Sequence, residues 1–182
     1  PAPFFRASAS TTGGNRTNID VTKPTGTVDG DIMIATIYIE QNPTYDTVTA
    51  PAGWTAFTEI NNTASTPDIR MLTYWKRASS EGASFNWSWT ASVYCEGSIS
   101  SFYGAASSGN PFNIEGASNT GDDTTAEATS VTTTVANTLI IGLYTTFASG
   151  SWAPAYTLPT QAANSSVIGT FYAAKLSPGA TG

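Results

Sequence analysis

The sequence contains no histidine and only one cysteine, Cys95. Without histidine, the chain has no side chain whose ordinary pKa puts its charge change between about pH 5 and pH 8, and a cysteine nucleophile would have no imidazole base. Zinc is not expected as a cofactor, because its protein sites are built mainly from Cys and His. A single cysteine cannot form an intramolecular disulfide. Since Cys95 lies in a strand-like stretch, we expect it to be buried as a small hydrophobic residue.

Charge is also scarce in this chain. Charged residues make up 11% of the sequence, less than half of the usual share of about 25%. The 7 Lys and Arg residues are scattered and the net charge is -6, so the basic stripe that nucleic-acid binding requires is missing. No apolar run approaches the roughly 20 residues that span a membrane. We therefore expect neither nucleic acid nor a membrane as a partner.

Hydroxyl groups take the place of charges on the expected surface, with 30 Thr and 20 Ser in the chain. Threonine suits strands because its branched β-carbon packs well on a pleated sheet. Few Lys or Glu residues are available to protect strand edges from pairing with other chains. This composition favours a secreted protein, or one held in an assembly, over a cytosolic enzyme.

Helical periodicity is absent as well: no stretch keeps apolar residues at i, i+3, i+4 and i+7 over three turns. Strand patterns separated by Gly, Pro, Asn and Asp are dense instead, and they predict an all-β fold, an antiparallel β-sandwich of jelly-roll type. The predicted strands are residues 4–10, 18–22, 31–40, 55–60, 69–78, 84–90, 93–103, 128–133, 138–147 and 166–176.

The second half of the sequence echoes the first in order and nearly in spacing. The echoes are residues 28–38 in 135–144, residues 50–55 in 153–157, and residues 73–78 in 171–176. No linker long enough to separate two domains interrupts the chain. We therefore predict a single domain over residues 1–182, built from two similar halves.

The two halves differ after their last shared turn. In the first half, residues 82–84 lead into two strong strand patterns that end at Tyr103, whereas the second half reaches Gly182 directly after its equivalent turn. We expect the domain to lack its last strands after Gly182. Either residues beyond Gly182 fill the gap, or a strand from another chain adds to the open edge.

The central strands of both halves are apolar at successive positions, in residues 32–39 and 139–144. Antiparallel strands with one wet face should alternate, so we expect both strands to be covered on both sides. In residues 84–90 the aromatic residues do alternate with polar ones and share one face. The predicted core comprises Ile34, Ile37, Trp54, Trp87, Trp89, Ile140 and Leu143.

The acidic residues suggest no catalytic pair of the kind that a glycosidase needs, and we expect no enzymatic activity. Glu96 is the only acid in a strongly predicted interior strand, and an outward position is favoured over a buried one. Calcium requires several oxygen ligands from a loop and is left open, with Asp122 and Asp123 as the first candidates. Asp29 and Asp31, which flank a glycine, are the weaker calcium candidates, because turns favour Asp and Gly for backbone reasons alone. No other cofactor is expected.

Two aromatic residues, Tyr45 and Trp152, stand at equivalent places in the two halves, after the central strand and before the Ala-Pro-Ala turn. We expect both at the same end of the sandwich. As exposed rings they would form a rim that contacts a ligand or partner, because sugar rings stack on such side chains. Plugging of the core, or a subunit contact, is the competing interpretation.

The succession of elements also resembles a known class. Gly30-Asp31 precedes an apolar strand, and Ala50-Pro51-Ala52-Gly53-Trp54-Thr55, Tyr74-Trp75-Lys76 and a Trp-rich strand come after it. From about Ser8 to Gly182 this resembles β-sandwich modules of bacteriophage structural proteins and of large bacterial surface or secreted proteins. Such modules close with a further strand after the Gly-Ala-Thr-Gly turn, where this chain departs from the pattern.

The resemblance implies a non-enzymatic structural component of a bacteriophage virion, such as a decoration, fibre or tail-associated protein. It would lie on the virion exterior and contact other virion proteins, as a homo-oligomer or lattice. The alternative is a carbohydrate-binding or adhesion module of a secreted bacterial surface protein, which would be extracellular and bind glycans.

Overall fold

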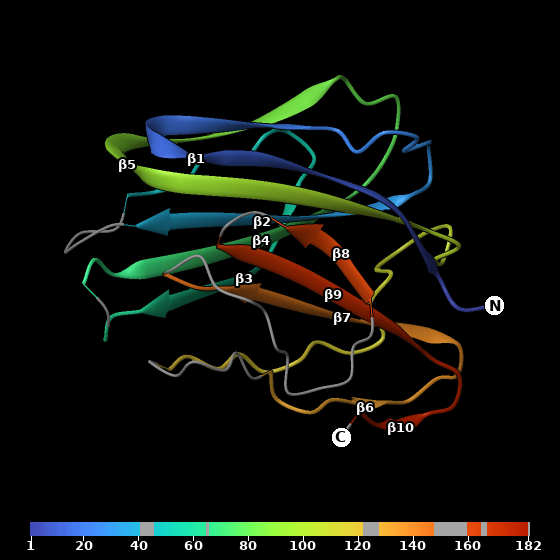
Figure 1. The fold of residues 1–182 in the computed structure, drawn as a ribbon. Helices are drawn as coiled ribbons and strands as arrows, with labels where there is room; N and C mark the ends of the chain where they lie inside the picture. The colour runs from blue at the N-terminus through green and yellow to red at the C-terminus, as the bar shows by residue number, and fades with distance from the viewer. Residues whose placement is uncertain (41–45, 65, 122–127, 148–159, 165–166, 182) are drawn as a thin grey trace.

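The computed structural model describes residues 1–40, 46–64, 66–121, 128–147, 160–164 and 167–181, and every regular element within them is a β-strand (Figure 1). The strands are β1 (Phe4–Thr22), β2 (Ile32–Glu40), β3 (Thr55–Asn62), β4 (Ile69–Arg77), β5 (Ser84–Tyr103), β6 (Thr132–Thr133), β7 (Thr138–Thr145), β8 (Thr160–Asn164), β9 (Ile168–Lys175) and β10 (Gly179–Ala180). The all-β prediction is confirmed for this part of the chain.

A five-stranded antiparallel sheet in the order β1-β5-β2-β4-β3 forms the centre of the molecule. The four predicted segments 4–10, 18–22, 84–90 and 93–103 belong to only two long strands, β1 and β5. Register shifts between Thr11 and Gly14 and between Arg16 and Asn18 interrupt their pairing. Such irregularities bend a strand, and the far half of the β1–β5 ribbon folds back over the sheet (Figure 1).

The main core lies between this folded ribbon and one face of the sheet. Trp87 is 0% exposed and packs edge-on against Trp54, with 5.2 Å between their ring centroids. Phe85 and Trp89 belong to the same cluster, as the alternating pattern predicted. Gly97 of β5 lies under the folded-back half of the ribbon, and a β-carbon there would be 2.6 Å from Val21 Cγ2 of β1. The close approach of the two layers therefore requires a residue without a side chain at this position.

A smaller antiparallel sheet, in the order β7-β9-β8, packs on the other face of the central sheet. Ile34 and Phe102 of the central sheet meet Leu139, Ile141 and Leu143 of β7 in this second interface. Strand β2 is therefore covered on both faces, with Ile34 in one core and Ile37 in the other, as predicted. The molecule is thus sandwich-like, with antiparallel sheets packed face to face.

The core prediction for β7 is only partly correct. Leu143 is half-buried and packs against the core cluster of the second interface. Ile140 is half-buried and belongs to none of the described core clusters, so its prediction as a core residue is wrong. They lie on opposite faces of β7, which is the terminal strand of its sheet within the described residues. An edge strand has a neighbour on one side only, so its side chains stay partly accessible on either face. The remaining predicted core residues, Ile34, Ile37, Trp54, Trp87 and Trp89, are buried.

Smaller differences concern the second half of the chain. Strands β8 and β10 were not predicted, and of the predicted strand 128–133 only Thr132 and Thr133 are extended, paired with β10. The order β2-β4-β3 and the order β7-β9-β8 share one arrangement, in which the first strand pairs with the third and the second lies outside. At the start of each unit, Gly30 N–H donates to Ala78 O at 2.9 Å and Asn137 N–H donates to Leu176 O at 3.2 Å.

Candidate functional site

Among the described residues, a groove of about 1090 Å³ lies between the outer strands β3 and β4 and the edge of β7. Its floor is apolar and includes Phe57, Ile60, Met71 and Trp75. Residues 111–121 form the opposite boundary. Phe112 anchors this boundary segment, with its ring centroid 4.8 Å from that of Phe57 and 5.5 Å from that of Trp75.

The floor is apolar because of strand register. In the central sheet Trp75 lies opposite Ile34, and Met71 lies opposite both Tyr38 and Ile60. Opposed residues point to the same face of a sheet, so these side chains all point toward the second sheet. That sheet covers the β2 side of this face, but β7 is its last described strand. No described strand covers the β3–β4 side of this face, which forms the floor of the groove.

The wall of the groove is a strand edge. Every residue from 138 to 147 lines it, whereas a strand that met the groove with one face would contribute alternate residues only. Strand β7 pairs with β9 from Thr138↔Lys175 to Thr145↔Ile168, and no described strand pairs with its other side. An edge strand presents a row of N–H and C=O groups that can pair with a further strand.

The groove carries little charge. Glu115 and Lys175 are the charged side chains among the described residues that line it. The groove's other polar side chains are uncharged, mainly Thr, Ser and Asn, so the lining can bury apolar side chains on its floor and hydrogen-bond polar groups elsewhere. The arrangement is suited to binding, and the additional feature that could orient a ligand is the backbone edge of β7.

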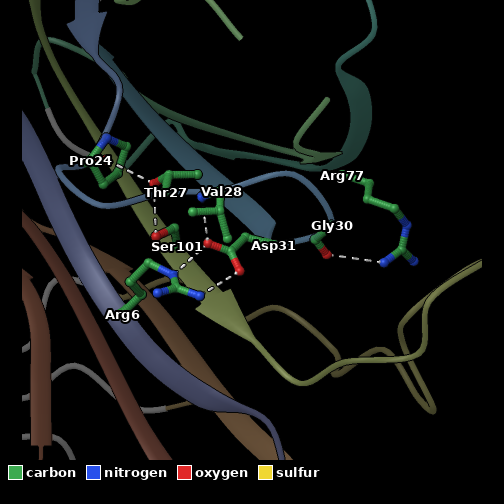
Figure 2. Close-up of polar contacts among 8 residues, drawn as sticks. All are labelled: Arg6, Pro24, Thr27, Val28, Gly30, Asp31, Arg77 and Ser101. Carbon is green, nitrogen blue, oxygen red and sulfur yellow. Dashed lines mark hydrogen bonds and ion pairs between the residues drawn. The ribbon is translucent and has the colours of Figure 1, made fainter. Parts of the chain in front are cut away.

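The best-defined polar contacts elsewhere are structural, as Figure 2 shows for the turn before β2. Asp31 is 3% exposed and accepts two hydrogen bonds from Arg6, at 2.5 Å from Nε and 3.0 Å from Nη2. Val28 N–H donates to the same carboxylate at 3.0 Å. The hydrogen bond with Asp31 is the main cause that raises the pKa of Arg6. This bidentate pair fixes β1 to the turn that starts β2.

The Asp29-Gly30-Asp31 turn, the weaker calcium candidate in the sequence, uses its carboxylates within the chain. Asp29 Oδ1 accepts a hydrogen bond from Ser80 N–H at 2.7 Å, and Asp31 is held by Arg6. Gly30 has a φ of 93°, a backbone conformation that favours glycine. Within the described residues no group of three or more His, Cys, Asp or Glu side chains could hold a metal ion.

Glu96 was expected to point outward, and this prediction is wrong. The side chain is 1% exposed and accepts a hydrogen bond from Tyr94 Oη at 2.8 Å. It lies on the face of β5 that the second sheet covers, next to Tyr38, whose pKa is raised mainly by burial and further by Glu40. The strand pattern could not show this, because the covering sheet comes from a distant part of the chain.

Cys95, the neighbour of Glu96, points to the opposite face and is fully buried, as predicted. Its thiol donates a weak hydrogen bond to Gly14 O at 3.6 Å. Burial raises the pKa of this thiol to about 11, so the reactive thiolate form is disfavoured at neutral pH. Its surroundings are those of a packing residue.

The contact and metal candidates named from the sequence, Tyr45, Trp152, Asp122 and Asp123, lie outside the residues that the structure describes. Their expected positions, including a shared end for Tyr45 and Trp152, stay predictions. The groove was not identified from the sequence as a site. The available signal was that Ile69, Met71 and Trp75 share one face of their strand. Phe57 lines the groove as well, but it lies at the register shift between Ala56 and Thr58, which the sequence pattern did not show.

Comparison of the chain with protein-family models, with curated proteins and with solved structures gives no match. In the described part of the chain no helix is long and apolar enough to cross a membrane. The candidate site therefore stands on its own geometry, an apolar groove bounded by a strand edge.

Proposed function

We propose that this protein is a non-enzymatic structural component of a multi-protein assembly, of the kind found in a bacteriophage virion as a decoration, fibre or tail-associated protein. The observation that carries the proposal is the apolar groove beside the edge of β7. A surface of this kind binds polypeptide, because backbone pairing supplies affinity and the apolar floor supplies contacts for side chains.

The position of the groove along a strand edge supports a polypeptide ligand. Its volume of about 1090 Å³ is large enough for several side chains, at the upper end of the range of about 300–1,000 Å³ that small-molecule pockets also occupy. The low share of charged residues, 11%, fits a surface that packs against neighbouring subunits. Partners would be other virion or surface proteins, or further copies of this chain, on the virion exterior or in the extracellular medium.

The proposal includes a finer description of the fold, a jelly-roll sandwich of two similar halves over residues 1–182. The shared order of β2-β4-β3 and β7-β9-β8 supports it. So does the corner before each unit, where Gly30 and Asn137 both have positive φ, 93° and 58°. A non-glycine residue with positive φ is uncommon, which makes the agreement at this corner informative.

The alternative function is a carbohydrate-binding or adhesion module, and one observation favours it. Phe4 and Tyr103 are 48% and 42% exposed, and their rings stack with centroids 5.5 Å apart. The Arg6 guanidinium lies 4.8 Å from the Tyr103 ring centroid. Exposed aromatic faces beside a polar donor can bind sugar rings.

Measurement of the oligomeric state and of glycan binding separates the two functions. For the structural role, we expect the protein to occur in many symmetric copies when its native particle is imaged by electron cryomicroscopy. For the alternative, we expect binding on a glycan array that is lost in Tyr103→Ala and retained in Val135→Ala, which changes an exposed apolar residue elsewhere. A protein that occurs singly and binds a glycan through Tyr103 would contradict the structural proposal.

A further inference from the structure

We propose that the groove binds one extended segment of a partner protein, which adds as a strand antiparallel to β7 along Leu139–Leu143, on the side where no described strand pairs with it, and lays apolar side chains on the β3–β4 floor. This inference rests on the proposed structural function and specifies the chemistry of its partner. The segment would extend the β7-β9-β8 sheet by one strand.

The first half of the chain provides the template for this pairing. Strand β2 is the first strand of its unit and pairs with β4 on one side. Its other side pairs antiparallel with β5, from Ile32↔Phe102 to Ile39↔Cys95. Strand β7 holds the same place in β7-β9-β8, with no described strand on that side. The incoming strand would occupy the position that β5 occupies beside β2.

The template also shows what the segment must supply. The part of β5 that pairs with β2 places Glu96, Ser98, Ser100 and Phe102 on the face toward the second sheet, and Phe102 is the one large apolar side chain among them. The incoming segment would therefore share the backbone pairing of β5 but carry apolar residues at these alternate positions. The floor below the β7 edge offers Ile60, Met71 and Trp75. Apolar side chains at alternate positions of the incoming strand would reach this floor.

The shape of the groove favours a single strand over a second copy of this domain. Strand β7 has 8 residues, which at roughly 3.4 Å per residue gives an edge about 27 Å long. Residues 111–121, anchored by Phe112, close the groove on the side opposite β7. A whole sheet from a second copy would meet this boundary, whereas one extended segment fits between it and β7.

Hydrogen exchange of the full chain tests the proposal with a defined probe. The probe is a synthetic peptide of residues 94–103 carrying Cys95→Ser, with Glu96→Val, Ser98→Val and Ser100→Val so that the alternate positions facing the floor are apolar, and a scrambled peptide of the same composition is the control. At saturating peptide, we expect exchange of the Leu139–Leu143 amides to slow by at least about tenfold, because bound ligand shifts the equilibrium toward the closed form. The scrambled peptide should leave these amides unchanged.

A matched pair of variants locates the binding surface. Ile60→Lys places a charge on the groove floor at a half-buried position of an edge strand, and we expect it to abolish the peptide-induced protection. Val28→Lys adds the same charge at a residue that is 54% exposed and does not line the groove, so protection should be retained. Thermal unfolding of both variants shows whether each is folded before the exchange measurement.

Three results would overturn the inference. One is the absence of protection at millimolar peptide. Another is protection of the β7 amides without peptide at every protein concentration, which would mean that the chain fills its own groove. The third is protection that rises with protein concentration alone, which would identify a second copy as the occupant. If the native particle still shows many symmetric copies, only this inference fails and the structural function stands.

Discussion

Strands β2 and β7 are alike in sequence and in their place within a three-strand unit, yet their surroundings differ. Strand β2 lies between β4 and β5, and residues 32–39 are all buried. Strand β7 pairs with β9 alone among the described strands, and Leu139, Ile140, Ile141 and Leu143 are half-buried. The difference shows that an apolar sequence makes a strand fit for burial, while neighbours on both edges and both faces complete it.

The folded β1–β5 ribbon is the element that completes the environment of β2. Residues 95–102 of its strand β5 pair with the edge of β2 that faces away from β4. Its folded-back half supplies Ile19, Val21 and Trp87 to the core above the same strand. No described segment does both for β7. Substitutions and changes of pH test this contrast between the surroundings of β2 and those of β7.

The largest effect is expected on replacing Trp87, which fills the core between the ribbon and the sheet. Trp87→Ala should lower the free energy of unfolding by about 3–5 kcal/mol, through lost burial and the cavity left behind. Leu143→Ala on β7 should lower it by less than about 2 kcal/mol, because the side chain is already half-exposed. Urea denaturation of both variants measures the difference. Equal losses would show that the second interface is as tightly packed as the first.

Alkaline pH tests the same core through Cys95. Its folded-state pKa is raised to about 11, so above roughly pH 9 the exposed thiol of the unfolded chain ionises while the folded one stays neutral. The unfolded state then binds fewer protons, and stability present below pH 9 should fall, by at most about 3 kcal/mol, as the pH approaches 11.

Cys95→Ala is the control, because it removes this contribution and leaves that of the buried tyrosines. Denaturation curves at a series of pH values give the slope for each protein. Identical slopes for the two proteins between pH 9 and pH 11 would mean that the thiol is accessible to solvent in the folded state.

A methyl group at Gly97 should separate the ribbon from the sheet. Gly97→Ala is expected to cost about 1–3 kcal/mol, the usual range for overpacking, because its β-carbon would be 2.6 Å from Val21 Cγ2. Gly82→Ala, where no atom lies within 4 Å of the new carbon, should change stability by less than about 0.5 kcal/mol.

Val21→Ala in the Gly97→Ala background should recover part of the loss, since the two sites are in contact and their effects are not additive. A double-mutant cycle of chemical denaturation measures this coupling. Strict additivity would place the cause of the Gly97 effect elsewhere.

The smallest expected effect compares β2 and β7 directly, one methyl group at a time. Ile37→Val should cost about 1 kcal/mol, since Ile37 is fully buried and Ile→Val changes in cores usually cost about 0.5–1.5 kcal/mol. Ile140→Val should cost less than about 0.5 kcal/mol, because Ile140 is half-buried. Thermal unfolding by calorimetry resolves the pair. A larger loss at Ile140 would show that the outward face of β7 is packed more tightly than its exposure indicates.

Local patterns predicted most strands of the first half, because alternation and turn residues depend on near neighbours in the chain. They also placed Phe85, Trp87 and Trp89 on one face correctly. They divided β1 and β5 into separate strands, because Gly13, Gly14 and the residues around Ser92 look like breaks. In the structure both strands run through these positions, and their pairing resumes beyond each one in a shifted register. Glu96 was misplaced because the sheet that covers it lies far away in sequence.

The sequence alone determined that this is an all-β protein with a Trp-rich core, a buried cysteine and a repeated strand pattern, since these depend on residue type and short-range periodicity. Only the tertiary structure decided that β5 completes one edge of β2 and that the matching edge of β7 borders an apolar groove. The physical reason is that burial and strand pairing depend on which distant segments meet. Local side-chain patterns carry no information about that meeting until the chain has folded.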